Sequence, residues 1–299
     1  MRDLIIIGSG AAGLSAALYA SRFGLNVLVI SKELGGCIAD SYCVENYLGI
    51  ENISGEDLID RFKKHCDSFN VNFEFEEVYS IDGEDGDFVV YTENGEYQTK
   101  KIILALGMKR LMLNVKGERE FMGRGITFCA VCDGSFFKNK KVFVVGGGDV
   151  AISTALIMKK YTNNVTLIVR EPKFTAQPRM QVLGNNIDVL FNKEIIEFKG
   201  ENKLKKVKLS DNNEIDVDGV FISVGSKPDE KLTTNLHLNV DEEGYVLVNP
   251  RMQTSRGGVY CAGDLSTGSN KLRQVSTAIS EGTIAAHSVY EDLVSLKID

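Results

Sequence analysis

Two glycine-rich turns, each between a short apolar run and a helical stretch, constrain the fold of this chain more than any other feature. The first is GSGAAG at residues 8–13, which follows the apolar run 4–7 and precedes a predicted helix over 14–23 and a predicted strand over 26–30. A short continuous apolar run is typical of a buried parallel strand. The G-x-G-x-x-G spacing gives a tight turn, lets the backbone approach a pyrophosphate and lets helix and strand pack closely. Together these features predict a dinucleotide-binding βαβ unit.

A second turn of the same kind predicts a second nucleotide-binding fold. Residues 141–145 form a strand pattern, GGGDVA at 146–151 matches G-x-G-x-x-A, and a predicted helix over 151–160 and a predicted strand over 165–169 follow. A chain of 299 residues is long enough for two domains. The sequence thus indicates an α/β protein that binds two dinucleotides, or one dinucleotide beside an unused fold.

The amino-acid composition and net charge indicate which kinds of partner this chain is unsuited to bind. Hydrophobic residues make up 43% and charged residues 25% of the chain, and the net charge is -7. These values are ordinary for a globular enzyme, and the negative charge argues against nucleic acid and anionic membranes as partners. No apolar run approaches the ~18 residues of a membrane span, and glycines end the N-terminal apolar run too early for a signal peptide. We therefore expect a cytoplasmic protein.

The segment GITFCAVCDGSFF at 125–137 contains the one C-x-x-C of the chain, Cys129 and Cys132, directly followed by Asp133. Such a pair can bind a metal, form a structural bridge or cycle between dithiol and disulfide. A structural zinc site needs four ligands, but there is no second C-x-x-C and the three histidines are isolated. Six cysteines are too few for a disulfide scaffold in a chain this long. A redox-active pair is therefore favoured.

The C-terminal segment 257–290 predicts a strand at 259–261, a turn that presents Asp264, and a long helix over 275–293 preceded by Arg273 and Gln274. A carboxylate at a strand end can accept hydrogen bonds from sugar-alcohol hydroxyls, and a helix N-terminus suits the electron-rich edge of a flavin. Taken alone, the segment is equally compatible with an ordinary terminal helix.

Six motifs occur together and in order: GSGAAG at 8–13, VENYLG at 44–49, CAVCDG at 129–134, GGGDVA at 146–151, DGVFISVGSKP at 218–228, and YCAGD at 260–264 with LRQ at 272–274. In this combination the chain resembles the low-molecular-weight thioredoxin reductase family over essentially its whole length. The resemblance implies two Rossmann-like, doubly wound, three-layer domains. A discontinuous FAD-binding domain, 1–112 and 243–299, would be interrupted by a pyridine-nucleotide-type domain, 113–242, that carries the C-x-x-C. It also implies bound FAD, a homodimer, and reduction of a thioredoxin-like protein.

The same resemblance assigns an FAD site. The glycines of the first turn would approach the pyrophosphate, Asp264 would hold the sugar-alcohol chain of the flavin, and Glu33 would replace the ribose-binding acid that many members have where Ser31 stands. The predicted site residues are Gly8, Gly10, Ala11, Ala12, Gly13, Glu33, Gly35, Gly36, Cys37, Asn46, Gly107, Gly263, Asp264, Arg273, Gln274 and Val275. Cys37 and Cys43 are interpreted as small buried thiols near the flavin rather than as a second redox pair.

The resemblance also assigns the redox roles. Cys132 would take electrons from the flavin, Cys129 would attack the disulfide of the partner, and Asp133 would donate and accept the proton. Thiol exchange requires one cysteine that reaches the substrate and one that resolves the mixed disulfide, which agrees with this division. No histidine lies near the motif, so Asp133 is the nearest acid-base candidate. Its alternative role is that of a helix N-cap.

The electron donor is left open, because the sequence departs from the family pattern after the second nucleotide strand. NADPH-dependent members have a histidine and three arginines where this chain has Val169, Arg170, Glu171 and Thr175. An acidic group reverses the sign of an arginine–phosphate contact, so NADPH is in doubt. NADH, a ferredoxin-like carrier and NADPH all remain candidates. The residues that a nucleotide would use are Gly146, Gly148, Asp149, Arg170 and Glu171.

Two further expectations concern motion and alternative functions. Hinges between the domains are predicted near residues 111–117 and 239–244, which contain glycines and short polar runs. A flavin-dependent dithiol oxidase, which passes electrons from a dithiol to oxygen, and a non-enzymatic redox sensor are the alternatives to a disulfide reductase.

Overall fold

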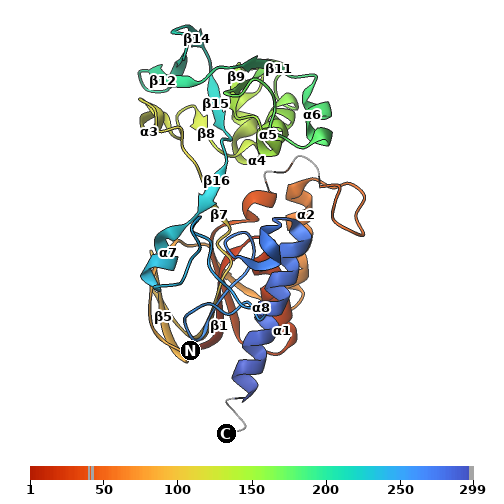
Figure 1. Ribbon diagram of the computed structural model, residues 1–299, viewed down its shortest axis with the longest axis vertical. Coiled ribbons are helices and arrows are strands. Elements are labelled where there is room, and N and C mark those ends of the chain that lie inside the picture. Colours follow the sequence, from red (N-terminus) through yellow and green to blue (C-terminus); the bar gives the residue numbers. More distant parts are fainter. Residues whose placement is uncertain (40, 42–43, 296–299) are drawn as a thin grey trace. The chain divides into compact units, whose positions relative to one another are not determined.

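The computed structural model describes residues 1–39, 41 and 44–295, apart from the side chains of Cys132 and Ser295. The chain divides into two compact units (Figure 1). Unit 1 contains residues 1–39, 44–109 and the segment that starts at Lys227, and unit 2 contains the continuous segment 110–226. The chain leaves unit 1 along β7 (Met108–Arg110) and returns along β16 (Ser226–Pro228), and these two strands pair with each other.

Unit 1 is built on a sheet in which β6 (Glu96–Leu104) is the shared strand. One part of the sheet is parallel, in the order β3-β2-β1-β6 with β17 beside β6; its other strands are β1 (Arg2–Ser9), β2 (Val27–Leu34), β3 (Asn72–Glu74) and β17 (Val259–Cys261). The first half of β6 also pairs antiparallel with β5 (Asp87–Thr92), which pairs with β4 (Val78–Glu84). The carboxyl ends of β1, β6 and β17 therefore meet at one edge.

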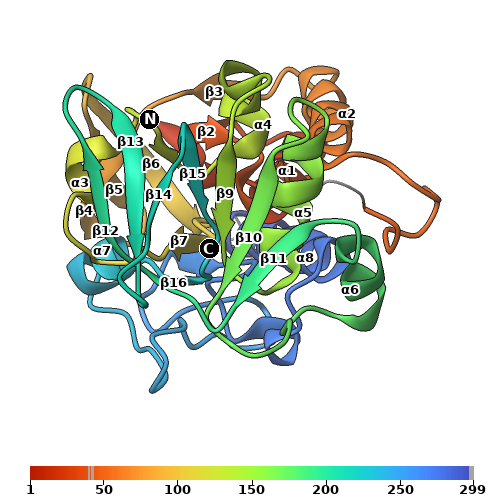
Figure 2. The same cartoon turned by 90° about the horizontal axis from the view of Figure 1, so that it is seen from above.

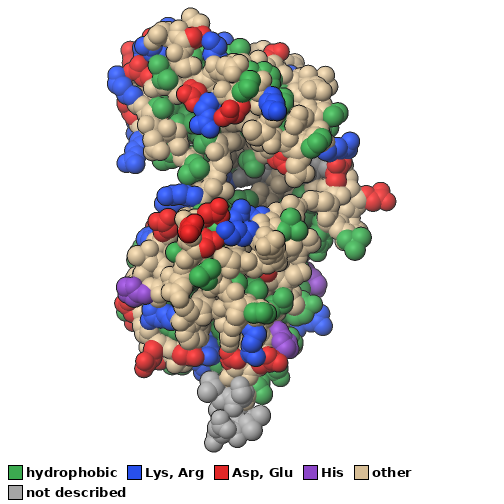
Figure 3. Space-filling view, in the orientation of Figure 1, with side chains coloured by type: hydrophobic (Ala, Val, Ile, Leu, Met, Phe, Trp, Pro, Cys, Tyr) green, Lys and Arg blue, Asp and Glu red, His purple; other side chains and the backbone are tan. Residues whose placement is uncertain are grey.

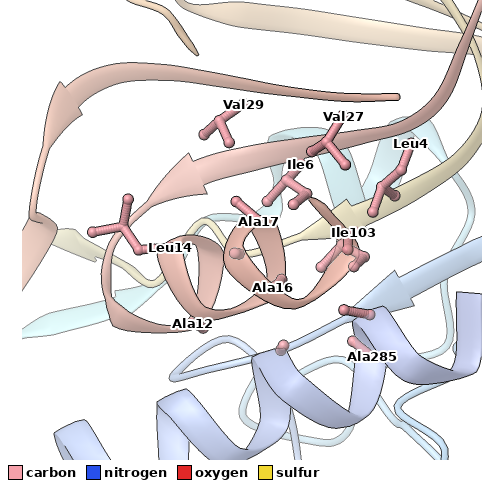
Figure 4. Packing of buried hydrophobic residues seen from close by; sticks show 14 of the residues in the cluster. Leu4, Ile6, Ala12, Leu14, Ala16, Ala17, Val27, Val29, Ile103 and Ala285 are labelled. Atoms are coloured by element: carbon pink, nitrogen blue, oxygen red, sulfur yellow. The ribbon is translucent and has the colours of Figure 1, made fainter. Parts of the chain in front are cut away.

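One face of the unit 1 sheet is covered by α1 (Ala11–Arg22), α2 (Gly55–Asp67) and α8 (Val275–Ser295). Figure 4 shows the alanines of α1 and α8, among them Ala12, Ala16 and Ala285, against Leu4, Ile6 and Ile103 of the strands. Small side chains let the two helix backbones approach closely: a Cβ atom on Gly282 would lie 2.1 Å from the Ala12 carbonyl oxygen. The glycine-rich start of α1 is thereby fixed from behind by α8.

The other face of the sheet packs on the antiparallel strands and on α7 (Glu230–Asn235). Phe88 and Val90 of β5 are fully buried there, together with Leu232 and Leu236. Two short 3-10 helices, η1 (Gly36–Ile38) and η3 (Gly268–Lys271), complete the described elements of unit 1.

Unit 2 has three layers (Figure 2). Its central sheet is parallel, in the order β11-β10-β9-β15-β8, with strands β8 (Ile126–Thr127), β9 (Val142–Val145), β10 (Val165–Val169), β11 (Asp188–Phe191) and β15 (Gly219–Ile222). One face packs against α4 (Ala130–Asp133), α5 (Asp149–Lys159) and α6 (Pro178–Gly184). The other face packs against an antiparallel sheet of β12 (Ile195–Gly200), β13 (Leu204–Leu209) and β14 (Glu214–Asp216). The short helix α3 (Glu118–Phe121) precedes β8 in the chain, and η2 (Gly134–Phe137) follows α4.

The structure confirms the elements predicted around both glycine turns. The first turn lies between β1 and α1 and the second between β9 and α5, and each following strand, β2 or β10, pairs in parallel with the strand before the turn. The predicted C-terminal strand and helix are β17 and α8. The fold is therefore α/β, with a Rossmann-like arrangement in each unit.

One predicted domain boundary differs from the structure. Residues 227–242, which we assigned to the inserted domain, belong to unit 1 because Leu232, Leu236 and Leu238 are buried in its core. The first passage at 109/110 lies close to the predicted boundary at 112/113.

The predicted hinge segments also differ from the places where the chain passes between units. Segment 111–117 is held within unit 2: the Glu118 carboxylate accepts hydrogen bonds from the backbone N–H groups of Leu113 (2.7 Å) and Asn114 (2.6 Å). Segment 239–244 lies within unit 1, where the Asn239 carbonyl accepts from Leu247 N–H at 3.0 Å. The passages are instead β7 and β16, flanked by Gly107 and Gly225, both with positive φ.

The face in Figure 3 carries acidic and basic side chains side by side. Such mixing agrees with a net charge of -7 spread over a chain of ordinary composition. Among the described residues, no helix combines the length and the apolar character that a membrane span requires.

Candidate functional site

The first glycine turn brings the backbones of β1, α1 and β6 together. A Cβ atom on Gly8, whose φ is +110°, would lie 2.2 Å from the Ala105 carbonyl oxygen, and one on Gly13 would lie 1.9 Å from the Gly8 carbonyl oxygen. Gly10 is different, because the nearest atom to its Cβ position, the Gly35 carbonyl oxygen, is 3.8 Å away. Gly8 and Gly13 are thus required by packing, whereas the absence of a side chain at Gly10 leaves open space in front of the turn.

That open space lies at the N-terminus of α1. Gly10 is its N-cap residue and supplies no side-chain hydrogen bond, and Ala11 and Ala12 of the first turn are buried. The first N–H groups of a helix have no partner within the helix, and they favour an anion such as a phosphate. The turn therefore offers backbone donors, without side chains, to a phosphate-containing group.

A second loop, after β2, lies directly beside this turn. Gly35 N–H donates to the Ser9 carbonyl at 3.1 Å, and the hydroxyls of Ser9 and Ser31 both donate to the Glu33 carbonyl at 2.8 Å. The nearest atom to a Cβ on Gly36 would be Gly10 Cα, 4.0 Å away. The turn 8–13 and the loop with Gly35 and Gly36 thus form one open surface lined by glycines, called the glycine wall below. The exposed side chain of Glu33 stands at the end of β2, which is where a Rossmann-type site places a ribose-binding acid.

Asp264 lies where β17 ends, at the same sheet edge. Gly263, with φ +83°, brings it there, and a Cβ on Gly263 would lie 2.9 Å from the Ala12 Cβ. Among the described residues no side chain or backbone donor bonds to the Asp264 carboxylate. Burial raises the pKa of Asp264 above its usual value, the Arg273 guanidinium opposes this, and the Glu281 carboxylate adds to it. A partly buried carboxylate that lacks donors suits the hydroxyls of a sugar-alcohol chain.

Arg273 and Gln274 precede α8 at this site. The Arg273 guanidinium lies 4.1 Å from the centre of the Tyr245 ring, and Asn46 Nδ2 donates to Gln274 Oε1 at 2.7 Å. Val275, the first residue of α8, is partly buried against the cores around α1 and α2. Asn46 and Gln274 are far apart in sequence, so their contact is brought about by the fold.

The predicted FAD residues therefore converge within unit 1. Gly107 joins them from the end of β6, with φ +63° and nothing within 4 Å of its Cβ position. The open glycine wall, the helix N-terminus without a cap and the carboxylate that lacks a donor fit a dinucleotide with a sugar-alcohol chain, as FAD has.

The predicted redox motif begins directly after β8 in unit 2. Cys129 is disulfide-bonded and its N–H donates to Thr127 Oγ1 at 3.2 Å. The side chain of Cys132 lies outside the described residues, although its backbone belongs to α4. Gly134 must be a glycine, because its Cβ would lie 2.7 Å from the Tyr161 ring.

The Asp133 carboxylate accepts a hydrogen bond from the Thr127 hydroxyl. Asp133 also stands at the N-cap position of η2, but its side chain makes no cap hydrogen bond there. The simple N-cap role is therefore not what holds this carboxylate. Thr127 was missed at the sequence level, since a threonine six residues before an aspartate carries no signal in a strand-to-helix segment.

The second glycine turn is covered by the segment that follows β10. The N–H groups of Thr175 and Ala176 donate to the Gly147 carbonyl at 2.9 and 3.1 Å, and Asp149 Oδ1 accepts from Gln177 N–H at 2.7 Å. Gly146 is required by packing, since its Cβ would lie 2.2 Å from the Ser223 carbonyl oxygen. The nearest atom to a Cβ on Gly148 would be Thr175 Oγ1, at 3.8 Å, so space remains in front of the turn.

Arg170, the arginine that the family pattern retains, is paired with acids. Its Nε lies 3.2 Å from Glu171 Oε1 and 3.7 Å from Glu194 Oε1. Both contacts are largely exposed, so they are weak, but they place negative charge where a 2′-phosphate would need positive charge. Arg170 therefore shares its guanidinium between two carboxylates.

The remaining described cysteines differ in exposure. Cys66 and Cys261 are buried thiols, whereas Cys37 is exposed. Cys37 lies in the loop after β2, and its burial beside the flavin stays a prediction; Cys43 lies outside the described residues. Burial raises the pKa of Cys66 to about 11, and burial also raises the pKa of Cys261.

These pKa directions predict which thiols react with iodoacetamide. At pH 8 only about one in a thousand Cys66 side chains is thiolate, since the pH is about three units below its pKa. We expect alkylation of the oxidised, FAD-free protein to modify Cys37 and to leave Cys66 and Cys261 unmodified, as read by peptide mass spectrometry. Equal labelling of Cys37 and Cys66 at pH 8 would contradict the structure, and labelling in denaturant provides the control for complete reaction.

Comparison with known proteins gives consistent matches over the whole chain. Residues 2–282 match the family described as pyridine nucleotide-disulphide oxidoreductase. A thioredoxin reductase from Bacillus subtilis is 39% identical over 298 residues, covering 96% of this chain and 93% of its own. A solved thioredoxin reductase from Lactococcus lactis has a TM-score of 0.87 at 31% identity, covering 99% of this chain and 100% of its own. A structure described as a ferredoxin-flavin thioredoxin reductase from Clostridium acetobutylicum has a TM-score of 0.56 at 31% identity, covering 98% of both chains.

Proposed function

Because this chain belongs to the low-molecular-weight thioredoxin reductase family, we propose that its flavoprotein disulfide reductase activity serves a thioredoxin-like protein through Cys129 and Cys132. The observation that carries the proposal is the disulfide-bonded Cys129 in a motif whose aspartate, Asp133, is held by a threonine hydroxyl. A structural disulfide needs no acid-base group beside it, whereas a disulfide that opens and closes does.

The proposed cofactor is FAD, held in unit 1. The N-terminal N–H groups of α1 would bind its pyrophosphate, Glu33 its adenosine ribose and Asp264 its ribityl hydroxyls. When bound, the flavin supplies a two-electron reductant, which matches the two electrons that a disulfide accepts. The Arg273 and Gln274 side chains would position its ring from the start of α8.

The exchange chemistry belongs to the cysteines and to Asp133. In the dithiol state a Cys129 thiolate attacks one sulfur of the partner disulfide; the bond between the two partner sulfurs breaks and the leaving sulfur takes a proton. Cys132 then attacks Cys129 in the mixed disulfide, which restores the intramolecular disulfide and releases the second partner thiol. Asp133 lies next to Cys132 in sequence, and we propose that it moves the protons of these two steps.

We propose that NADPH is not the preferred electron donor. Arg170 is engaged by Glu171 and Glu194, so a 2′-phosphate would meet two carboxylates and one shared guanidinium. A ferredoxin-like one-electron carrier is our first candidate, in line with the related ferredoxin-flavin enzyme. NADH is the second, because the space in front of Gly148 is compatible with a pyrophosphate.

Anaerobic reduction of the flavin tests this proposal. The holoprotein is mixed separately with reduced ferredoxin, NADH or NADPH, and loss of flavin absorbance is followed with and without oxidised thioredoxin. We expect fast bleaching with ferredoxin or NADH, slow bleaching with NADPH, and reappearance of thioredoxin thiols. If no donor bleaches the flavin, the reductase proposal fails. Oxygen consumption driven by reduced thioredoxin would instead indicate the dithiol oxidase, and a cycling disulfide without turnover would indicate the sensor.

Replacing Thr127 tests the role of Asp133. Thr127→Val keeps the shape of the side chain but removes the hydroxyl that donates to the Asp133 carboxylate and accepts from Cys129 N–H. Losing a hydrogen bond to a charged group is expected to lower the turnover number about tenfold. Thr127→Ser retains the hydroxyl and is expected to keep most of the activity. Equal turnover numbers for the valine and serine variants in a thioredoxin-reduction assay would remove Thr127 from the site.

We also propose that the enzyme works as a homodimer in the cytoplasm. Support comes from the family resemblance and from the net negative charge. Sedimentation velocity of the FAD-loaded protein is expected to give one species of twice the chain mass, and a monomer at micromolar concentration would contradict this.

A further inference from the structure

Glu281 is a buried acidic residue in the second turn of α8, and the proposed function leaves it without a role. Its exposed fraction is 4%. Among the described residues it forms no ion pair. Burying an unpaired carboxylate costs several kcal/mol unless hydrogen bonds compensate, so the groups around this side chain should explain why it is there.

One oxygen of Glu281 fastens the loop that carries Asp264. Glu281 Oε2 accepts from Gly263 N–H at 2.8 Å and from the Ser266 hydroxyl at 2.8 Å, and Ser266 Oγ in turn accepts from Gly268 N–H at 3.0 Å. The loop is therefore bonded to this carboxylate directly at Gly263 and Ser266, and through Ser266 at Gly268. Asp264 follows directly after Gly263.

The loop is shaped around this carboxylate. A Cβ on Gly268 would lie 2.7 Å from Glu281 Oε1, so the chain can close over the acid only with a glycine there. The residues Gly263, Asp264, Ser266, Gly268, Arg273 and Glu281 line one small pocket. Asp264 and Glu281 thus face the same pocket from the loop and from α8.

The hydrogen bonds to Glu281 do not by themselves require a negative charge at this position. The side-chain oxygen of a glutamine could accept the same two hydrogen bonds without the cost of a buried charge. The negative charge acts on Asp264: burial raises the pKa of Asp264, Glu281 raises it further, and Arg273 lowers it. Arg273 and Glu281 act on Asp264 from the elements packed against it, and Lys271, which lines the same pocket, is paired with Asp241 and Glu243.

We propose that Glu281 is a positioning residue of the flavin site, which fixes the Asp264 loop by hydrogen bonds and sets by its charge the pH below which Asp264 releases the ribityl chain. The inference rests on the proposed FAD site. In its ionised form Asp264 accepts hydrogen bonds from the ribityl hydroxyls; once protonated it loses much of that capacity. Because like charge favours protonation, FAD binding weakens at a higher pH than it would with an ordinary carboxyl.

The test is FAD affinity as a function of pH, measured by quenching of flavin fluorescence on addition of apoprotein. For Glu281→Gln we expect an FAD affinity at pH 8 within about threefold of the wild type. The acid limb, that is, the fall in FAD affinity on acidification, should have its midpoint at a lower pH than in the wild type. Ser266→Ala keeps the charge but removes the hydrogen bonds from Ser266 to Glu281 and from Gly268 to Ser266, so it should weaken binding by about tenfold without moving the midpoint. Glu291→Gln removes an exposed charge from the same helix and serves as the matched control, with no change expected.

The outcomes separate this inference from the proposed function. If the wild-type apoprotein does not bind FAD at pH 8, the proposed function fails. If it binds FAD but the acid limb of Glu281→Gln coincides with that of the wild type, Glu281 has no electrostatic role and the inference is overturned. Wild-type affinity in Ser266→Ala would equally overturn it, because these hydrogen bonds would then be without effect on the site. Far-ultraviolet circular dichroism of each apoprotein identifies variants that fail to fold, and Ser266→Ala remains informative if Glu281→Gln is one of them.

Discussion

The Cys129→Ser protein is expected to retain its flavin and to lose thioredoxin reduction by about a thousandfold or more, as is usual when a nucleophile is removed. A serine hydroxyl is not ionised at neutral pH and cannot form a mixed disulfide. The flavin should still bleach with the preferred electron donor, because the FAD site lies in unit 1 and the mutation in unit 2. Measurement of thioredoxin thiols during steady-state turnover gives the rate.

Two controls make this result specific. Cys66→Ala removes a thiol that packs in the core of unit 1 and donates a hydrogen bond to the Leu14 carbonyl, and it should turn over like the wild type. Reductive titration of Cys129→Ser should require one two-electron equivalent fewer per subunit than the wild type, since the redox disulfide is gone. If Cys129→Ser reduced thioredoxin at the wild-type rate, the C-x-x-C would not be the exchanging pair.

The second large effect is expected from Gly282→Ala in the middle of α8. Alanine is the better helix former by about 1 kcal/mol, so an exposed site would be stabilised. Here the added Cβ would lie 2.1 Å from the Ala12 carbonyl oxygen, and α1 and α8 would have to separate. Overpacking of this kind typically costs about 1–3 kcal/mol. Because α1 begins at the glycine turn, FAD affinity should fall together with stability.

Urea denaturation of the apoprotein and FAD titration measure these two effects. Ser280→Ala, two residues earlier and exposed, changes the same helix without entering the contact and should shift neither quantity appreciably. A Gly282→Ala protein with unchanged denaturation midpoint would show that the helices are not held this closely. Unchanged FAD affinity in a destabilised protein would separate the helix contact from the site.

The strand–turn–helix units could be predicted because their signals are local. The run 4–7 and the glycines after it fix β1, the turn and the start of α1 within a few residues, and 141–151 do the same in unit 2. The return boundary could not be predicted in this way. Residues 227–242 show no change of composition. Tertiary contacts assign them to unit 1, among them the burial of their leucines with β4 and β5 and the hydrogen bond from Ile81 N–H to Asn235 Oδ1.

The candidate site was predictable where a motif names the residue itself, and less so where the residue matters because it holds another one in place. Asp264 and Asp133 follow from their motifs. Their supports, Glu281 and Thr127, lie on other elements, and no periodicity links them to the residues they hold. Gly117 shows the opposite error. As a glycine it suggested a hinge, yet it is needed because a Cβ would lie 2.4 Å from the Phe198 carbonyl oxygen.

The insertion of unit 2 between the two parts of unit 1 has a consequence for biosynthesis. Residues 110–226 are continuous, so unit 2 can fold as soon as it leaves the ribosome. Unit 1 cannot, because β17 and α8 are made last, and the sheet edge, the Asp264 loop and the helix behind the glycine turn all depend on them. The flavin site is therefore the last part of the molecule to form, and a chain stopped before β17 would carry the redox motif without the means to hold its cofactor.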